Sequence, residues 1–143
     1  MECLIFSQVR QSIPISKTSI QNAVFLVLKR EHRPGSISIH LIGDAAMTQL
    51  NRVHRGKNRT TDVLSFAANE GKWFGPKTDE LGDIFISVAQ IKRQAKTWQV
   101  TAAEEFTRML IHGTLHILGY DHVKPGEAKI MFTKQEKYLT ASK

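Results

Sequence analysis

Hydrophobic and polar positions follow two periods along the chain, and these periods predict where strands and helices lie. Residues 37–41 alternate between apolar and polar side chains, which predicts a strand with one buried face. Residues 2–9 are predicted to form an earlier strand. Between these strands, apolar residues recur at helical spacing over residues 14–32, with Ser16 near the predicted helix start. The first third of the chain is therefore expected to be strand, helix, strand.

The rest of the chain is expected to contain four helices and two short strands. The strands are predicted at residues 63–66 and 81–87, with a loop or loose hairpin between them. The predicted helices begin at the capping residues Asp44, Ser87 and Thr101 and at Pro125. This element order predicts an α+β fold in which helices pack on a mixed β-sheet. With 143 residues the chain has room for a single domain, predicted to span residues 1–143.

Periodicity also predicts which side chains are buried. Met47 and Met109 are expected in the core, and Trp98 is expected on the inner face of the helix that follows Ser87. Trp73 and Phe74 lie in the loop between the short strands. They are expected either to pack back on the sheet or to lie exposed beside a substrate.

Composition limits the cellular setting. Hydrophobic residues make up 41% of the chain, as expected for a folded globular protein, and no apolar run approaches the length of a membrane span. The first residues lack the basic segment of a signal peptide. The single cysteine, Cys3, permits no internal disulfide and is consistent with a reducing compartment. We therefore expect a cytoplasmic protein without a membrane partner, and its oligomeric state is left open.

The charge of the chain favours a polyanionic partner. The formal net charge is +7, and a balance of this size raises encounter rates with nucleic acid, although net charge also serves plain solubility. Four basic residues follow one another within eight positions with no acid among them. This stretch predicts a phosphate-contacting loop built from Arg52, Arg55, Lys57 and Arg59.

Three of the six histidines lie within residues 112–122 and predict a metal site. His112 and His116 are four residues apart, so a helix places them on one face, and Gly119 allows a turn that brings His122 back towards them. Three imidazoles with a free fourth position are typical of catalytic zinc, and the spacing equals that of the metzincin proteases. Gly113 stands where those proteases have the general-base glutamate.

The missing glutamate favours phosphodiester chemistry over peptide hydrolysis. A peptidase needs a proton shuttle to the leaving amine, and a glycine cannot supply one. A divalent ion held by three neutral imidazoles can polarise a phosphoryl oxygen and activate water, and RNA can supply its own 2′-hydroxyl as nucleophile. Asp121 and Cys3 remain possible fourth ligands, which would make the site structural.

Three sequence blocks resemble one known family. Residues 112–122, HGTLHILGYDH, closely resemble the signature of the YbeY family of endoribonucleases and ribosomal RNA maturation factors. Residues 50–66 are similar to its L-N-x-x-x-R and T-D-V-L-S-F segments, and residues 81–87 resemble its L-G-D-I-x-I-S segment. Thr60 and Ala67 depart from the family, which usually has proline at both positions, but they remove no chemical group.

The resemblance implies a function and a site. It implies a zincin-like fold and a zinc-dependent, single-strand-specific endoribonuclease in small-subunit ribosomal RNA 3′-end maturation and ribosome quality control. It also implies ribosome-associated partners, one zinc ion, and a catalytic role for Arg55, which matches the family's arginine. Two alternatives stay open: a zincin-type metalloprotease, and a non-catalytic RNA- or ribosome-binding module with a structural metal.

Several other polar residues are expected to support the site rather than to react. Asp62 is expected to form a hydrogen-bonded turn with Thr61 and Ser65, and Asp83 to form a turn or a bond to a ligand histidine. His54 is a less favoured acid or base. Tyr120 and Asp121 are expected to hold His122 in place.

Overall fold

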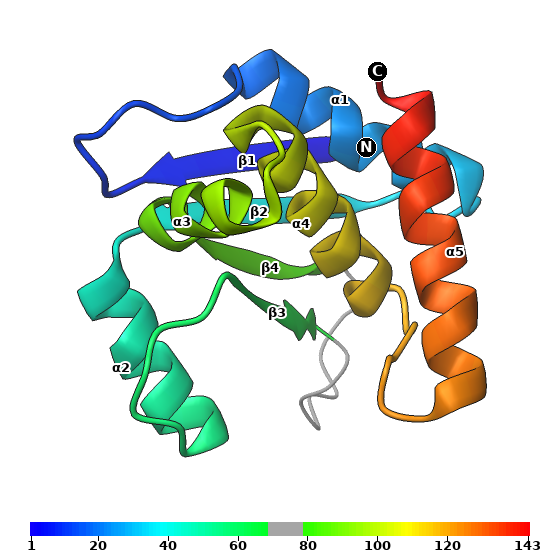
Figure 1. The fold of residues 1–143 in the computed structure, drawn as a ribbon. Helices are drawn as coiled ribbons and strands as arrows, with labels where there is room; N and C mark the ends of the chain where they lie inside the picture. Colours follow the sequence, from blue (N-terminus) through cyan, green and yellow to red (C-terminus); the bar gives the residue numbers. More distant parts are fainter. Residues whose placement is uncertain (69–78) are drawn as a thin grey trace.

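Four strands form one mixed sheet in the order β1-β2-β4-β3. The computed structural model describes residues 1–68 and 79–143, so Trp73, Phe74 and most of the predicted loop around them lie outside the described residues. The strands β1 (Glu2–Ser7), β2 (Ser36–Ile42) and β4 (Glu80–Ser87) are parallel, and β3 (Val63–Ala67) is antiparallel to β4. The strand β3 is therefore one edge of the sheet and β1 is the other (Figure 1).

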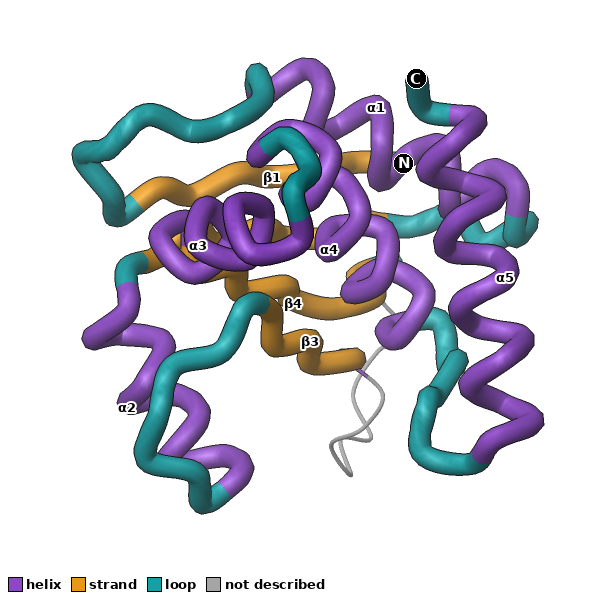
Figure 2. The backbone as a smooth tube through the Cα atoms, in the orientation of Figure 1, coloured by secondary structure: helices purple, strands orange, loops and turns teal. Residues whose placement is uncertain are grey.

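Within the described residues, five helices pack around this sheet and confirm the predicted α+β class (Figures 1 and 2). One face is covered by α1 (Lys17–Arg30), α3 (Val88–Trp98) and α4 (Ala102–Ile117). The helix α5 (Pro125–Ala141) packs against the outer side of α4. The helix α2 (Asp44–Arg55) packs on the opposite face near β3 and β4, where its apolar side chains meet theirs.

The main core lies between the sheet and the three covering helices. Phe106 and Leu110 of α4 are fully buried against strand residues such as Ile39 and Ile84. Each fully buried side chain of this size stabilises the fold by about 1.5–3 kcal/mol. The packing fixes α4 on the sheet, and the C-terminal half of α4 is thereby held beside β3.

Predicted caps are confirmed at three helices and wrong at one. The side chains of Ser16, Ser87 and Thr101 each accept a hydrogen bond from the backbone N–H three residues on. Asp44, by contrast, is the first residue of α2, and Gly43 occupies the cap position. The Asp44 carboxylate instead accepts hydrogen bonds from three side chains, which joins the start of α2 to neighbouring elements. These donors are Thr60, Ser87 and Arg93.

The structure corrects one prediction of burial and refines another. Trp98, expected in the core, is 69% exposed at the end of α3, although Ile91 and Ala95 on the same helix face are buried. Periodicity identifies the face of a helix but not where the element beneath it ends. Met109 packs against the main core as expected but is only partly buried and also lines surface cavities, whereas Met47 is fully buried as expected. The end of α3 and the middle of α4 thus present apolar groups to solvent.

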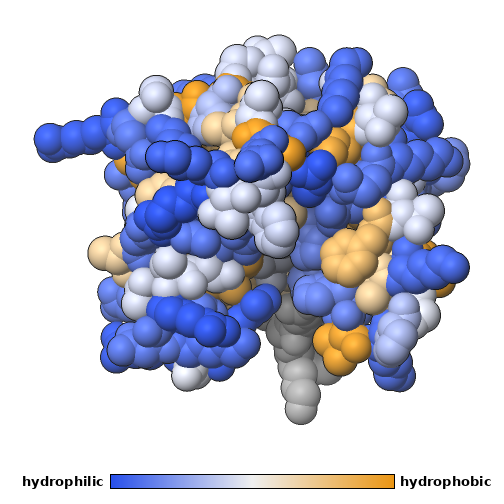
Figure 3. All heavy atoms as spheres, viewed as in Figure 1, coloured by the Kyte–Doolittle hydropathy of each residue, from blue (hydrophilic) through white to orange (hydrophobic). Residues whose placement is uncertain are grey.

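The helix-bearing side of the molecule is mostly hydrophilic, with an apolar area on the α5 side (Figure 3). The apolar side chains most exposed along and just before α5 are Val123, Ile130 and Phe132. Among the described helices, none is both long enough and apolar enough to cross a membrane.

Candidate metal and phosphate site

The three predicted histidines come together at the C-terminal end of α4. His112 and His116 lie one helical turn apart with ring centroids separated by 6.5 Å. Gly119 has a φ of +105°, in the region that favours glycine, and the chain turns back there after the helix. His122 follows this turn, with its ring centroid 5.4 Å from that of His112 and 5.9 Å from that of His116. The three rings therefore lie near one another, but the described group whose ligand atoms lie within 4.8 Å of one another consists of His116, Asp121 and His122 and leaves out His112.

These rings line a cavity of about 310 Å³ at the β3 edge of the sheet. Its walls come from α4, β3, the chain leading into β3, the end of α2, and α5. The guanidinium-bearing side chain of Arg55 lines the same cavity as the three histidines. The other lining residues are Thr61, Asp62, Val63, Ser65, Met109 and Phe132.

Hydrogen bonds fix the orientation of two histidine rings. His112 Nδ1 donates to the Gln135 side-chain oxygen at 2.7 Å, and His116 Nδ1 donates to the Tyr120 carbonyl at 2.8 Å. Each bond leaves the Nε2 lone pair free, which is the arrangement usual for a metal-ligating histidine. Burial lowers the pKa of His112 below its ordinary value and outweighs the opposing hydrogen bond to Gln135. A neutral ring at pH 7 is the form that binds a cation.

Asp121 lies closer to the site than the sequence indicated. Side-chain ligand atoms of His116, Asp121 and His122 lie within 4.8 Å of one another, so these three groups could hold a metal ion. Asp121 Oδ1 also accepts the backbone N–H of His122 at 2.7 Å, which supports the predicted positioning role. Cys3 is remote, because it lies in the main core on β1, at the opposite edge of the sheet. Burial raises the pKa of its thiol to about 11.

The structure gives Gly113 a packing role that spacing did not reveal. A Cβ atom at this position would lie 2.9 Å from Ser65 Oγ and 3.1 Å from Ile84 Cγ2. Ser65 Oγ donates a hydrogen bond to the Gly113 carbonyl at 3.2 Å. Helix α4 therefore approaches β3 and β4 so closely that a side chain at position 113 would require Ser65 or Ile84 to shift.

The basic stretch is only partly a loop, which corrects the prediction. Arg52 and Arg55 belong to the last turn of α2, and the helix ends at Gly56 with a φ of +69°. Lys57 and Arg59 follow in the loop, and all four side chains are exposed. Cations at a helix C-terminus interact favourably with the helix dipole. Of the four, only Arg55 lines the histidine cavity.

The structure confirms part of the predicted role of Asp62 and contradicts the predicted bond from Asp83 to a ligand histidine. Asp62 Oδ1 accepts from Thr61 Oγ1 and from the Val63 N–H, as expected for a local turn, but Ser65 bonds to Gly113 instead. Asp83 does not bond to a ligand histidine: its carboxylate pairs with His40 Nε2 at 2.8 Å. Sheet register explains this pairing, because Asp83 lies opposite Ser38 beside His40 on the face away from α4.

Two residues of α5 were missed by the sequence analysis. Gln135 is buried and orients His112, and Phe132 lies 6.2 Å from the His112 ring and 6.3 Å from the His122 ring between centroids. The signal in the sequence was spacing, because Gln135 lies four residues after Met131 and therefore on the apolar face of the helix. No contribution of α5 to the site was predicted.

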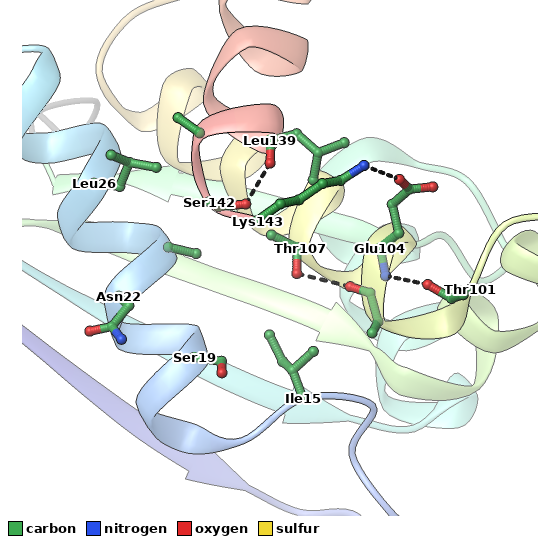
Figure 4. A pocket seen from close by; sticks show the side chains of 13 residues that line it. Ile15, Ser19, Asn22, Leu26, Thr101, Glu104, Thr107, Leu139, Ser142 and Lys143 are labelled. Carbon is green, nitrogen blue, oxygen red and sulfur yellow. Dashed lines mark hydrogen bonds and ion pairs between the residues drawn. The ribbon is translucent and has the colours of Figure 1, made fainter.

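A larger cavity of the described chain lies elsewhere. It has a volume of about 650 Å³ and is bounded by α1, the start of α4 and the C-terminus (Figure 4). Its two charged groups neutralise each other, since Lys143 Nζ donates to Glu104 Oε1 at 2.8 Å. The chemistry-bearing groups are therefore in the smaller histidine cavity.

Sequence comparisons identify the family of the chain. The family model described as Endoribonuclease YbeY matches residues 6–143. The chain belongs to the YbeY family. Its YbeY relatives include a protein of Carboxydothermus hydrogenoformans, named Endoribonuclease YbeY, which is 39% identical over 122 residues. That match covers 85% of this chain and 82% of the relative. An Endoribonuclease YbeY of Halalkalibacterium halodurans is 40% identical over 112 residues, covering 73% of this chain and 70% of the relative.

A solved structure supports the fold of this YbeY chain. The solution structure of TM1509 from Thermotoga maritima matches with a TM-score of 0.66 and 26% sequence identity. The match covers 98% of this chain and 88% of that chain. The sheet and the helices of the described residues therefore follow a known arrangement.

Proposed function

We propose that this chain is a zinc-dependent, single-strand-specific endoribonuclease that holds one zinc ion with His112, His116 and His122. The observation that carries the proposal is that three imidazoles and the Arg55 side chain line one cavity. The curated relatives named Endoribonuclease YbeY support the reaction class.

The donor set suits zinc. Neutral imidazole nitrogen is a common zinc ligand, and three such ligands leave a position for substrate or water. A bound divalent ion there would supply Lewis-acid stabilisation of a phosphoryl oxygen and acidify nearby water. Asp121 stands close enough to serve as a further oxygen ligand or to orient His122.

Arg55 would act on the phosphate. In-line displacement at a phosphodiester places negative charge on non-bridging oxygens, and a guanidinium fork can bind two such oxygens. Arg52, Lys57 and Arg59 would attract the neighbouring phosphates through diffuse charge. The 2′-hydroxyl of RNA would serve as nucleophile: its oxygen bonds to the adjacent phosphorus as the bond from phosphorus to the 5′-oxygen breaks, and its proton passes through solvent to that leaving oxygen. This route reduces the need for a protein base at Gly113.

The cellular part of the proposal rests on family membership. We propose that the substrate is ribosomal RNA, cleaved during 3′-end maturation of the small-subunit RNA and during ribosome quality control. This RNA cleavage would take place in the cytoplasm together with ribosome-associated proteins. The net charge of +7 supports a polyanionic substrate.

The test uses purified protein of known metal content with three substrates: single-stranded RNA, fully paired RNA and casein. Wild-type protein is expected to cleave the single-stranded RNA, and a chelator should abolish cleavage. Arg55→Ala should keep the fold and the zinc but lose cleavage by about 10²–10³-fold, the usual effect of removing one group that stabilises transition-state charge. Arg55→Lys should recover only part of the rate, because an ammonium lacks the bidentate fork.

Each outcome separates the alternatives. Casein hydrolysis without RNA cleavage would identify a metalloprotease. Salt-dependent RNA binding without any cleavage would identify a binding module with a structural metal. Wild-type cleavage rates in Arg55→Ala would remove Arg55 from the proposed mechanism.

A further inference from the structure

A second hollow adjoins the histidine cavity. It has a volume of about 640 Å³, within the range of about 300–1,000 Å³ found for small-molecule sites. Asp62, Met109 and Phe132 line both spaces, so the two are neighbours. The remaining walls come from the end of α3, from α4 and from α5. They are Gln94, Trp98, Val100, Glu105, Arg108, Gln135 and Glu136.

Two exposed aromatic rings stand in the walls of this second hollow. Trp98 is 69% exposed and Phe132 is 45% exposed, and they come from different helices. Aromatic faces in an open groove are the usual surface on which unpaired bases stack. Since Phe132 also lies against His112 and His122, a base stacked here would be next to the phosphate cavity.

The second hollow is lined mainly by acidic side chains among its charged residues, whereas the C-terminal end of α2 is basic. Asp62, Glu105 and Glu136 contribute three carboxylates, and Arg108 is the one cation among the lining residues. Arg108 is already engaged, since it donates to Glu105 at 3.0 Å and to Glu136 at 3.2 Å. Backbone phosphates are repelled by such a surface, whereas an uncharged base is not. Phosphates would instead follow the basic end of α2.

The hydrogen-bonding groups in the hollow are mostly acceptors. Gln94 Nε2 donates to Asp62 Oδ2 at 3.1 Å and to Glu105 Oε2 at 2.8 Å, so this amide donor is already used. The Glu136 carboxylate accepts from Arg108 and from Gln135 Nε2, but its side chain is 53% exposed, so its remaining lone pairs are accessible to a ligand. Carboxylates accept from the exocyclic amino groups of cytosine and adenine, and uracil has no such group.

We propose that the second hollow is a subsite for one unpaired nucleobase of the RNA, next to the phosphate held by Arg55. The subsite rests on the proposed endoribonuclease function and deepens it. A base inside a duplex is stacked on both sides and cannot enter, so the subsite supplies a structural reason for single-strand specificity. It favours bases that carry an amino group.

The test compares Trp98→Ala and Trp98→Phe with Phe6→Ala. Phe6 is an exposed aromatic residue on β1, at the opposite edge of the sheet, and serves as the matched control. Trp98→Ala should raise the KM for single-stranded RNA about 5- to 30-fold, in the lower part of the range for one base–aromatic stack. Zinc content and kcat at saturating RNA should stay unchanged. Trp98→Phe should recover most of the affinity, and Phe6→Ala should have no effect.

A second measurement locates the base. An abasic residue is placed at each position in turn along a 2′-O-methyl oligonucleotide that cannot be cleaved through its 2′-hydroxyl, and the Kd is measured. One position should lose affinity in the wild-type protein, and the same position should lose nothing further in Trp98→Ala. Cytosine or adenine there should bind more tightly than uracil, and Glu136→Gln should reduce this preference.

The outcomes separate the subsite from the function on which it rests. If wild type cleaves RNA but Trp98→Ala shows an unchanged KM and no abasic position matters, the subsite is wrong and the endoribonuclease proposal stands. If wild type neither binds nor cleaves single-stranded RNA, both proposals are wrong. Equal losses in Trp98→Ala and Phe6→Ala would also overturn the subsite, since they would indicate a general effect on the fold.

Discussion

Two polar clusters both include Tyr120, and they differ in how they use their hydrogen-bonding atoms. In the first, the Glu31 carboxylate accepts from Tyr120 Oη, Tyr138 Oη and Lys134 Nζ, and the Glu31 side chain is only 8% exposed. In the second, His112 and His116 each use Nδ1 for a protein partner and leave Nε2 towards a cavity. We call the Glu31 cluster closed, because protein donors bind its carboxylate. We call the histidine cluster incomplete, because Nε2 of each of these two rings remains free to bind a ligand.

The difference also appears in the pKa values. Burial alone would raise the pKa of Glu31, but hydrogen bonds from Lys134, Tyr120 and Tyr138 outweigh burial and lower it. Burial dominates at His112 and lowers its pKa, which keeps the ring neutral. In each case the environment favours the form that the cluster uses: a charged carboxylate for stability, and an uncharged imidazole for binding a cation. The following predictions test this comparison.

The largest effect is expected when the incomplete cluster loses a ring. His116→Ala should remove most of the zinc and reduce RNA cleavage to background, because two imidazoles cannot hold the ion tightly. Elemental analysis and a cleavage assay measure the two losses, and the free energy of unfolding of the metal-free protein should hardly change. Cys3→Ala is the control and should keep full zinc occupancy. A triple-alanine variant of the three histidines that keeps its zinc would overturn the ligand assignment.

A smaller effect is expected from the residue that orients a ring without binding the metal. Gln135→Leu should weaken zinc affinity about 10- to 100-fold, the usual loss when the hydrogen-bond partner of a ligand histidine is removed. Leucine keeps the volume of the buried side chain, so folding should persist. Competition with a chromophoric chelator measures the affinity, and Lys137→Ala on the exposed side of α5 is the control. Equal affinities in wild type and Gln135→Leu would show that the bond to His112 has no effect on binding.

The closed cluster should respond in stability rather than in metal binding. Glu31→Gln should lower the free energy of unfolding at pH 7 by about 1.5–3 kcal/mol, because hydrogen bonds to a charged group are lost. The folded-state pKa of Glu31 lies below its ordinary value of 4.5, so the wild-type advantage is present above pH 4.5 and is lost as the pH falls through the folded-state pKa. Urea unfolding at pH 7 and pH 3 tests this, and an equal difference at both pH values would contradict it.

The smallest effect is expected from the contact between α4 and the sheet. Gly113→Ala should destabilise the fold by about 1–2 kcal/mol, since overpacking outweighs the helix-propensity gain of alanine. Gly126→Ala is the matched control, because a Cβ there meets nothing within 4 Å, and it should be neutral or stabilise by up to about 1 kcal/mol. Thermal unfolding of both variants decides the point. If Gly113→Ala is as stable as Gly126→Ala, the steric account is wrong.

The sequence was sufficient for features that depend on local spacing. Strand and helix positions, the capping roles of Ser16, Ser87 and Thr101, and the convergence of the three histidines all follow from residues near one another in the chain. A helix fixes the relation between His112 and His116, and a glycine turn fixes that of His122. No knowledge of the remaining fold was required.

Features that depend on which elements meet could not be predicted in this way. Gln135 orients His112 only because α5 packs against α4, and Trp98 is exposed only because it lies at the end of α3. Asp83 was expected near the histidines, but strand alternation turns it to the opposite face, where it pairs with His40. Arg55 was selected by family resemblance, and its place in the cavity depends on how α2 crosses the edge of the sheet.

The close packing of Gly113 against Ser65 and Ile84 also limits the order in which substitutions could convert this site into a peptidase site. A glutamate at position 113 would require space before it could supply any chemistry, so Gly113→Glu alone should damage the fold instead of restoring a peptidase motif. Smaller residues at positions 65 and 84, or a shift of α4 away from the sheet, would have to come first. Any series of substitutions from the present sequence to a peptidase site therefore passes through variants with a less stable core.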